Sequence, residues 1–135
     1  MIEWRRGHPG DESILRAVEE KMGIALPADY RRLILAQSGA SPLSRIFTLR
    51  GRERVFDRLL SAEAAKRPNL ADALEWTTDF DRRLVPFAVD PFGNLLCFSY
   101  STDTACTVVF ADLESGEVNP VSMTFTGLLC LLKER

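Results

Sequence analysis

Few residues in this sequence have the type and spacing that catalysis requires. The chain of 135 residues contains one histidine, His8, and histidine-based acid–base or triad chemistry requires that ring beside a nucleophile or a substrate proton. Asp79 and Asp81 form a close pair of carboxylates, but glycosidase chemistry needs two carboxylates on opposite sides of the bond that is cleaved. The sequence shows no glycine-rich phosphate loop between a strand and a helix. We therefore expect no catalytic site, no cofactor and no metal site.

The three cysteines, Cys97, Cys106 and Cys130, lack the spacing of a metal site. Cys97 and Cys106 fall in neighbouring predicted strands, so a redox pair and two separate buried thiols both remain open, and buried thiols are the commoner case. We expect Cys130 to lie in the core. The odd cysteine count, the lack of an apolar leader and the lack of a long apolar run predict a cytoplasmic protein without a membrane span.

Charge is distributed unevenly along the chain. Residues 1–67 carry 13 Lys/Arg and 9 Asp/Glu, a net of +4, whereas residues 68–135 carry 4 and 10, a net of −6, and together they give the formal net charge of −2. This asymmetry indicates an acidic surface contributed by the second half. Arginine is the preferred residue for phosphate binding, and five arginines lie close together in the sequence: Arg45, Arg50, Arg52, Arg54 and Arg58. Because few aromatic residues separate them in an acidic chain, we do not expect direct nucleic-acid binding.

The stretch from Val85 to Tyr100 predicts the central hairpin of a sheet. Two apolar runs of strand length flank the sequence Asp90-Pro91-Phe92-Gly93-Asn94. Aspartate, then proline, then glycine is the preferred order of a type I turn, and glycine or asparagine at its end can adopt a positive φ.

Helices are predicted near both ends of the chain. Asp11 is the expected N-cap of a first helix that Gly23 ends, and Pro27 is expected at the first helical position of a second helix that ends at Ser38-Gly39. A last helix is expected from Phe125, with Ser122 or Thr124 as its cap. Residues 1–10 are predicted to be an N-terminal tail, with Trp4 as the residue that attaches it to the body.

The middle of the chain predicts strands at residues 46–49 and 106–111, with a short partner at residues 118–121. Residues 50–75 are the least regular, and we expect a short strand to about Leu60 and a helix from Ser61 to about Arg67, broken by Pro68-Asn69. Short turns between strands imply antiparallel pairing. The predicted fold is one α+β domain over residues 1–135, with a single mainly antiparallel sheet and helices packed on one side. The other face or its rim is then free for a partner.

Two stretches of the sequence match a known family in their order and spacing. The first runs from a helix containing Val18-Glu19 through Gly23-Ile24-Ala25-Leu26-Pro27-Ala28-Asp29-Tyr30-Arg31 to Gly39. The second comprises Val85-Pro86-Phe87-Ala88, Asp90-Pro91-Phe92-Gly93-Asn94, Cys97-Phe98-Ser99-Tyr100, Val108-Val109-Phe110 and a terminal helix that Phe125 opens. In this combination the chain resembles the SUKH superfamily, which includes fungal cell-wall regulators of the Smi/Knr type and many bacterial immunity proteins. The resemblance covers about residues 11 to 133.

The resemblance implies an α+β fold and binding rather than catalysis. Bacterial members neutralise toxins, often nucleases, of polymorphic or contact-dependent systems, so a cognate toxin domain is the expected partner. A regulatory scaffold of the Smi/Knr type without a toxin partner is the alternative function, and a small enzyme that uses carboxylates or a cysteine is a third hypothesis. Ser99 stands where an acidic residue is common in the family, so a role for that acid does not transfer to this chain.

The resemblance and the charge pattern predict two sets of residues, one that defines the fold and one that contacts a partner. The positions that match the family motif are expected to define the fold: Leu26, Pro27, Asp29, Tyr30, Gly39, Asp90, Pro91, Gly93 and Asn94. The candidate contacts with a basic partner are the acidic residues of the second half: Asp79, Asp81, Asp90, Asp112, Glu114 and Glu117. The oligomeric state and the identity of the toxin are left open.

Overall fold

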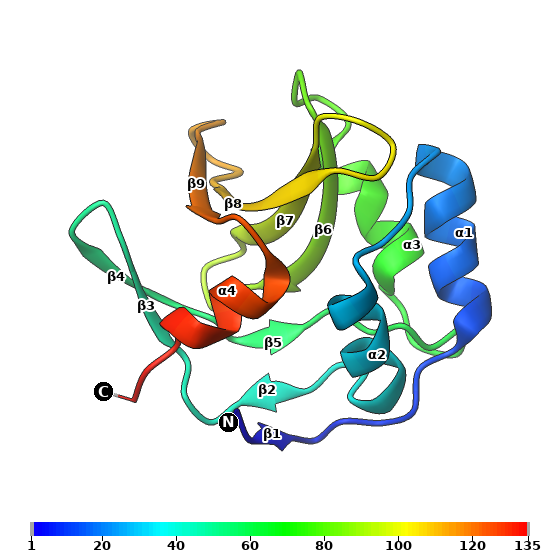
Figure 1. Ribbon diagram of the computed structural model, residues 1–135, viewed down its shortest axis with the longest axis horizontal. Helices are drawn as coiled ribbons and strands as arrows, with labels where there is room; N and C mark the ends of the chain where they lie inside the picture. Colours follow the sequence, from blue (N-terminus) through cyan, green and yellow to red (C-terminus); the bar gives the residue numbers. More distant parts are fainter. Residues whose placement is uncertain (1, 135) are drawn as a thin grey trace.

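The computed structural model describes residues 2–134 and has an α+β architecture, as predicted (Figure 1). The helices are α1 (Glu12–Met22), α2 (Ala28–Ala36), α3 (Leu70–Ala73), which continues into the 3-10 helix η1 (Leu74–Thr77), and α4 (Phe125–Leu131). The strands are β1 (Trp4–Arg5), β2 (Ser41–Pro42), β3 (Ile46–Leu49), β4 (Arg52–Val55), β5 (Arg58–Leu59), β6 (Arg83–Val89), β7 (Leu95–Tyr100), β8 (Cys106–Ala111) and β9 (Val118–Ser122). Among residues 2–134, every helix falls short of the length and apolar content that crossing a bilayer requires.

The largest sheet has five antiparallel strands in the order β5-β6-β7-β8-β9. β6 and β7 form the predicted central hairpin, in which Val85 lies opposite Phe98 and Val89 opposite Leu95. The register shifts between Pro86 and Ala88, so the proline, which has no amide hydrogen to donate, lies beside an irregularity in the ladder. The meander predicted from short turns is therefore confirmed.

A single sheet was expected, and this part of the prediction is wrong. Two further antiparallel sheets of two strands each, β1-β2 and β3-β4, accompany the five-stranded sheet, and the β3-β4 hairpin projects to one side in Figure 1. The central strands β6, β7 and β8 also bury apolar residues on both faces, because their sequences are apolar at nearly every position. The main core covers one face, and a smaller cluster on the other face contains Leu84, Leu95, Cys97, Val109 and Ala111.

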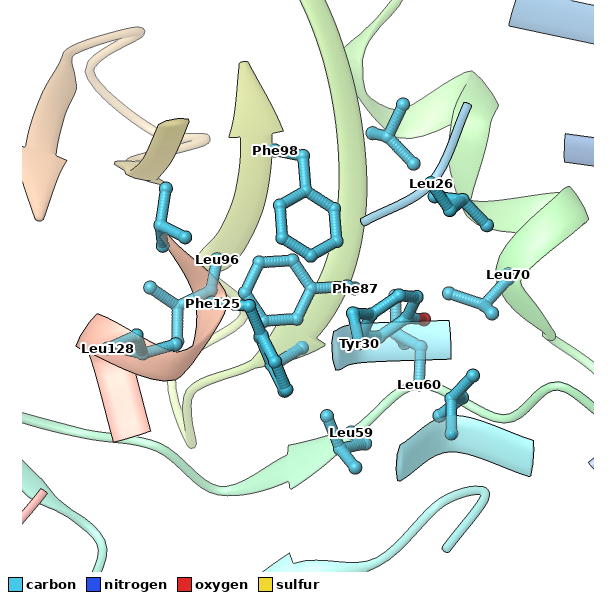
Figure 2. Close-up of a cluster of buried hydrophobic side chains, with 14 of the residues drawn as sticks. Leu26, Tyr30, Leu59, Leu60, Leu70, Phe87, Leu96, Phe98, Phe125 and Leu128 are labelled. Carbon is cyan, nitrogen blue, oxygen red and sulfur yellow. The ribbon is translucent and has the colours of Figure 1, made fainter. Parts of the chain in front are cut away.

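Tyr30 belongs to an aromatic cluster of four buried rings that joins two helices to the sheet (Figure 2). Its ring meets Phe98, Phe125 and Phe87 edge-on, at centroid distances of 5.0, 5.3 and 5.7 Å. Phe87 and Phe98 stack on each other at 4.3 Å. Aromatic pairs of this kind contribute about 0.5–1.5 kcal/mol beyond the burial of their area. The cluster therefore fixes α2 and α4 against β6 and β7.

The N-terminal segment that was predicted to be a tail is hydrogen-bonded to the rest of the protein. In β1 and β2, Trp4 lies opposite Pro42. His8 and Ser38 exchange backbone hydrogen bonds of 3.1 and 2.8 Å. Trp4 attaches the segment as predicted, since its ring packs edge-on against Phe56 at 6.0 Å. A two-residue strand is too short to leave a periodic pattern, which explains the error.

The helix predicted from Ser61 to Arg67 does not form, and the helix starts after Asn69 instead. The Asn69 side chain accepts hydrogen bonds from the amides of Ala71 and Asp72, and the Asp72 carboxylate accepts one from the Asn69 amide. This is a capping box, which fixes a helix start. The residues that were expected to break a helix therefore begin one.

Asp11 binds the segment before α3, residues 61–67, which forms turns and bends rather than a helix. It was predicted to cap α1, but its side chain makes no cap hydrogen bond. Its Oδ2 atom instead accepts a hydrogen bond of 2.7 Å from the amide of Ala64. Asp11 thus joins the end of the N-terminal segment to the residues that precede α3.

The ends of α1 and α2 follow the sequence closely. Gly23 adopts a φ of 67° and donates its amide to Glu19, which ends α1 as predicted. Pro27 is the N-cap of α2 rather than its first helical residue. An Arg31 guanidinium nitrogen lies 2.7 Å from Glu12 and 3.1 Å from Glu19. These ion pairs connect the two helices.

The predicted terminal helix is also present as α4. Thr124 is its cap, and the Thr124 hydroxyl oxygen accepts a hydrogen bond of 2.9 Å from the amide of Gly127. Leu128 and Leu132 are buried, but Cys130, which was predicted to lie in the core, is exposed. At about 100° per residue, position 130 lies on the opposite side of the helix from Leu128.

The two buried tyrosines give a test of this packing. Tyr30→Phe is expected to leave the free energy of unfolding unchanged or to raise it by about 1 kcal/mol, because an unpaired buried polar group is costly. The Tyr30 hydroxyl is buried and has no hydrogen-bond partner among residues 2–134. Urea denaturation measures the change.

Tyr100→Phe is the matched control. The Tyr100 hydroxyl donates a hydrogen bond of 2.9 Å to the carbonyl oxygen of Ala25, and its removal is expected to lower the free energy of unfolding by about 1 kcal/mol. Equal losses in the two variants would contradict the assignment of Tyr30 as unpaired.

Candidate functional site

The turn between β6 and β7 is stabilised by hydrogen bonds to an aspartate and leaves a phenylalanine side chain exposed. Asp90 is buried, and its Oδ1 atom accepts hydrogen bonds from the amides of Phe92 at 2.9 Å and Asn94 at 2.7 Å. Its Oδ2 atom accepts a third, of 3.1 Å, from the Asn94 side chain. Gly93 has a φ of 89°, which glycine adopts without strain. The turn leaves the Phe92 side chain 83% exposed.

The segment between α3 and β6 adds an aromatic residue and two carboxylates. Trp76, in η1, is 38% exposed, whereas the neighbouring Thr77 is buried. Asp79 and Asp81 are exposed on either side of Phe80. Phe80 is half-buried and packs against the smaller apolar cluster of the sheet. The segment is thus held by Phe80, with its carboxylates in solvent.

The turn between β8 and β9 repeats the arrangement of the first turn. Asp112 Oδ1 accepts hydrogen bonds from the amides of Glu114 at 2.9 Å and Ser115 at 3.1 Å. The hydrogen bond from the Ser115 amide, which favours the charged form, holds the pKa of Asp112 below its usual value. Gly116 has a φ of 81° and closes the turn. Leu113, at 40% exposure, and Glu114 are left in solvent.

Residues from these three segments line two adjoining grooves. The acidic groove, of about 430 Å³, is lined by Asp79, Phe80, Asp81 and Glu114 together with Trp76 and Leu113. The apolar groove, of about 420 Å³, is lined by Val89, Pro91 and Leu95, again with Trp76 and Leu113. Since Trp76 and Leu113 line both, they form the boundary between the two grooves.

The six acidic residues predicted as contacts take different positions. Asp79, Asp81 and Glu114 lie together in the acidic groove. Asp90 lines the apolar groove, but its carboxylate is hydrogen-bonded within its own turn, and Asp112 likewise shapes a turn. Glu117 is exposed and lines neither groove. Their roles in binding remain predictions.

Sequence reasoning missed three apolar residues of this surface: Trp76, Phe92 and Leu113. A signal was present in the sequence, because Phe92 and Leu113 stand in turns, where large apolar residues have no strand or helix face to bury them. Trp76 gave no such signal, since it lies in a segment that a helical pattern also fits.

The motif residues of the first half lie in the core and at chain reversals. Leu26 and Tyr30 are buried, and Gly39 adopts a φ of 73°. Asp29 connects two helices, since its Oδ2 atom accepts hydrogen bonds from the amide of Thr126 at 3.0 Å and from the Thr126 hydroxyl at 2.7 Å. With Pro27 as the N-cap of α2, all five residues have structural contacts or conformations that explain their types.

The histidine and the three cysteines occupy separate places in the fold. His8 lies in the backbone bridge to Ser38. Cys97 belongs to the smaller cluster on one face of the sheet, whereas Cys106 packs against the main core on the other, and all three cysteines are free thiols. Burial raises the pKa of the Cys97 thiol. Within residues 2–134, no group of three or more His, Cys, Asp or Glu side chains is placed to hold a metal ion.

Comparison with known families places the chain in one of them. The model of the SMI1/KNR4 family (SUKH-1) matches residues 9–130, which include every element from α1 to β9 and most of α4. The chain belongs to the SMI1/KNR4 family. Domains of this family are generally non-enzymatic and interact with proteins. No curated protein matches the sequence significantly.

The Asp90 turn gives the second test. Asp90→Ala is expected to lower the free energy of unfolding of this SMI1/KNR4 domain by about 1–3 kcal/mol, because it removes the acceptor for three hydrogen bonds in a buried position. Thermal or urea denaturation measures the loss.

Asp81→Ala is the control for that substitution. Asp81 is exposed, and surface changes of this kind are expected to stay within about 0.5 kcal/mol. If Asp81→Ala destabilised the domain as much as Asp90→Ala, the turn hydrogen bonds would not be the cause.

Proposed function

We propose that this SMI1/KNR4 domain is a non-catalytic immunity protein that acts in the cytoplasm. Its partner is a cognate toxin domain of a bacterial polymorphic or contact-dependent system, which it binds and neutralises. The observation that carries the proposal is the placement of exposed aromatic and acidic side chains around two adjoining grooves. The protein-binding character of the family supports the same conclusion.

The composition of this surface is typical of a protein interface. Binding energy at such interfaces is concentrated in aromatic and other large residues that become fully buried, and a polar rim surrounds them. Trp76, Phe92 and Leu113 are exposed large apolar residues here. Asp79, Asp81 and Glu114 supply charges beside them. A partner that covers these side chains removes their apolar surface from water, which is favourable.

The charge of the surface favours a basic partner, and nucleases are a class of toxin that fits. An enzyme that binds nucleic acid neutralises phosphates with lysine and arginine. A row of carboxylates complements such a cleft and accelerates encounter. The alternative function, a regulatory scaffold without a toxin, uses the same surface but does not require a basic partner.

The function is tested with the product of the neighbouring gene. The full chain is expected to retain that protein in a pull-down and, on co-expression, to restore the growth of cells that produce it. Retention without rescue of growth would favour the scaffold function. Neither retention nor rescue would exclude the proposed pairing.

Charge reversal then tests the acidic surface. The double variant Asp79→Lys/Asp81→Lys is expected to lower the association rate constant with the toxin about tenfold or more at low salt, since steering by complementary charge raises such rates by about 10 to 1,000-fold. The salt dependence of association should weaken in parallel. Surface plasmon resonance at several ionic strengths measures both.

The double variant Glu20→Lys/Glu134→Lys is the matched control, because it makes the same change of net charge at two exposed positions that line neither groove. Equal effects of the two double variants would assign the result to overall charge. An association rate that is insensitive to salt would contradict the acidic-surface account.

A further inference from the structure

The apolar groove is large enough to receive a side chain of a binding partner. Its lining combines the half-buried Val89, the exposed Pro91 and the partly exposed Trp76 and Leu113, over Leu95 at its base in the buried cluster. Phe92 stands between Pro91 and Gly93, both of which line the groove. Apolar surface of this kind gains free energy when another apolar side chain displaces its water.

We propose that the apolar groove binds one large apolar side chain of the partner, while a lysine or arginine next to it on the partner enters the acidic groove. This inference rests on the proposed function and specifies which residue types the partner presents. The shared boundary of Trp76 and Leu113 places the two subsites side by side. The partner's apolar and basic side chains must therefore be close together on one surface.

The charges around the two grooves indicate which kind of partner binds there. Asp79, Asp81 and Glu114 line the acidic groove without a basic residue among its lining. In the apolar groove Arg58 is accompanied by Asp57 and Asp90, so its charge is offset. A second copy of this chain, related by a two-fold axis through this surface, would bring carboxylates against carboxylates, which is unfavourable. An anionic lipid surface is disfavoured for the same reason.

The two subsites should act on different rate constants. Apolar contacts that form only in the docked complex mainly slow dissociation, whereas exposed charges mainly accelerate association. Leu113→Asp is therefore expected to raise the dissociation rate constant for the toxin about thirtyfold, a typical effect at a central interface position. Leu113 is exposed enough that this change leaves the fold intact, because its side chain belongs to neither apolar cluster.

Leu131→Asp is the matched control. Leu131 is 46% exposed, compared with 40% for Leu113, and lies on α4 away from both grooves. The proposal requires fast dissociation for Leu113→Asp and unchanged dissociation for Leu131→Asp. Equal dissociation rates for the two variants would overturn it.

A defined probe tests the recognition chemistry without the toxin. The isotope-labelled full chain is titrated with a blocked pentapeptide that has leucine between two lysines, and its amide chemical shifts are followed. Shift changes are expected at the residues of the two grooves, with a dissociation constant in the range of about 1 mM. A peptide with glutamates in place of the lysines, and one with glycine in place of leucine, should each bind at least threefold more weakly.

The outcomes separate this inference from the proposed function. Binding of all three peptides with equal affinity, shift changes elsewhere on the domain, or no shift changes at all would overturn the two-subsite arrangement, even if the toxin is still neutralised. Selective binding of the leucine–lysine peptide in the grooves would support it, even if no neighbouring toxin is found.

Discussion

The aromatic cluster around Tyr30 is the constraint on which the rest of the structure depends. It brings together one residue each from α2, from the two strands of the β6–β7 hairpin and from α4, so that three parts of the chain far apart in the sequence meet. Because the rings meet edge-on or stacked in a buried space (Figure 2), the helices cannot shift against the sheet without breaking several contacts at once. The hairpin is thereby held with its turn in solvent, and the position of that turn determines where the grooves can form.

The exposed side chains of Phe92 and Leu113 lie on two turns whose backbones are hydrogen-bonded in the same way. In both the β6–β7 and β8–β9 turns, an aspartate side chain accepts hydrogen bonds from two backbone amides of its own loop. This aspartate is Asp90 in the first turn and Asp112 in the second. A loop whose amides are bound in this way loses little conformational entropy when a partner covers it. The backbone at Phe92 and Leu113 is therefore already ordered, so a partner that buries these side chains orders little further backbone.

The sequence predicts the elements whose signals are local and fails where distant partners decide. The β6–β7 turn, the end of α1 at Gly23 and the cap of α4 at Thr124 follow from residue types within a few positions. Residues 61–67 form no helix, and distant partners bind their amides: the Ala62 amide donates to the Ser38 hydroxyl and the Ala64 amide to Asp11, more than fifty positions earlier. The β1 strand escapes detection because two residues cannot show a period. The grooves could not be predicted from the sequence because residues of three loops line them. The spacing of residues within one loop does not indicate which other loops lie beside it.

Carboxylates that look equivalent in the sequence have different roles in the structure. Asp90 and Asp112 accept backbone hydrogen bonds, so their replacement alters a turn before it alters a binding surface. Asp79, Asp81 and Glu114 are exposed side chains at the acidic groove, and changes at such positions cost little stability. The two kinds of residue can therefore change independently. A scaffold with its turns fixed by buried or backbone-bound aspartates can acquire a new pattern of surface charge, and with it a new partner, while the aromatic core and the hairpin remain as they are.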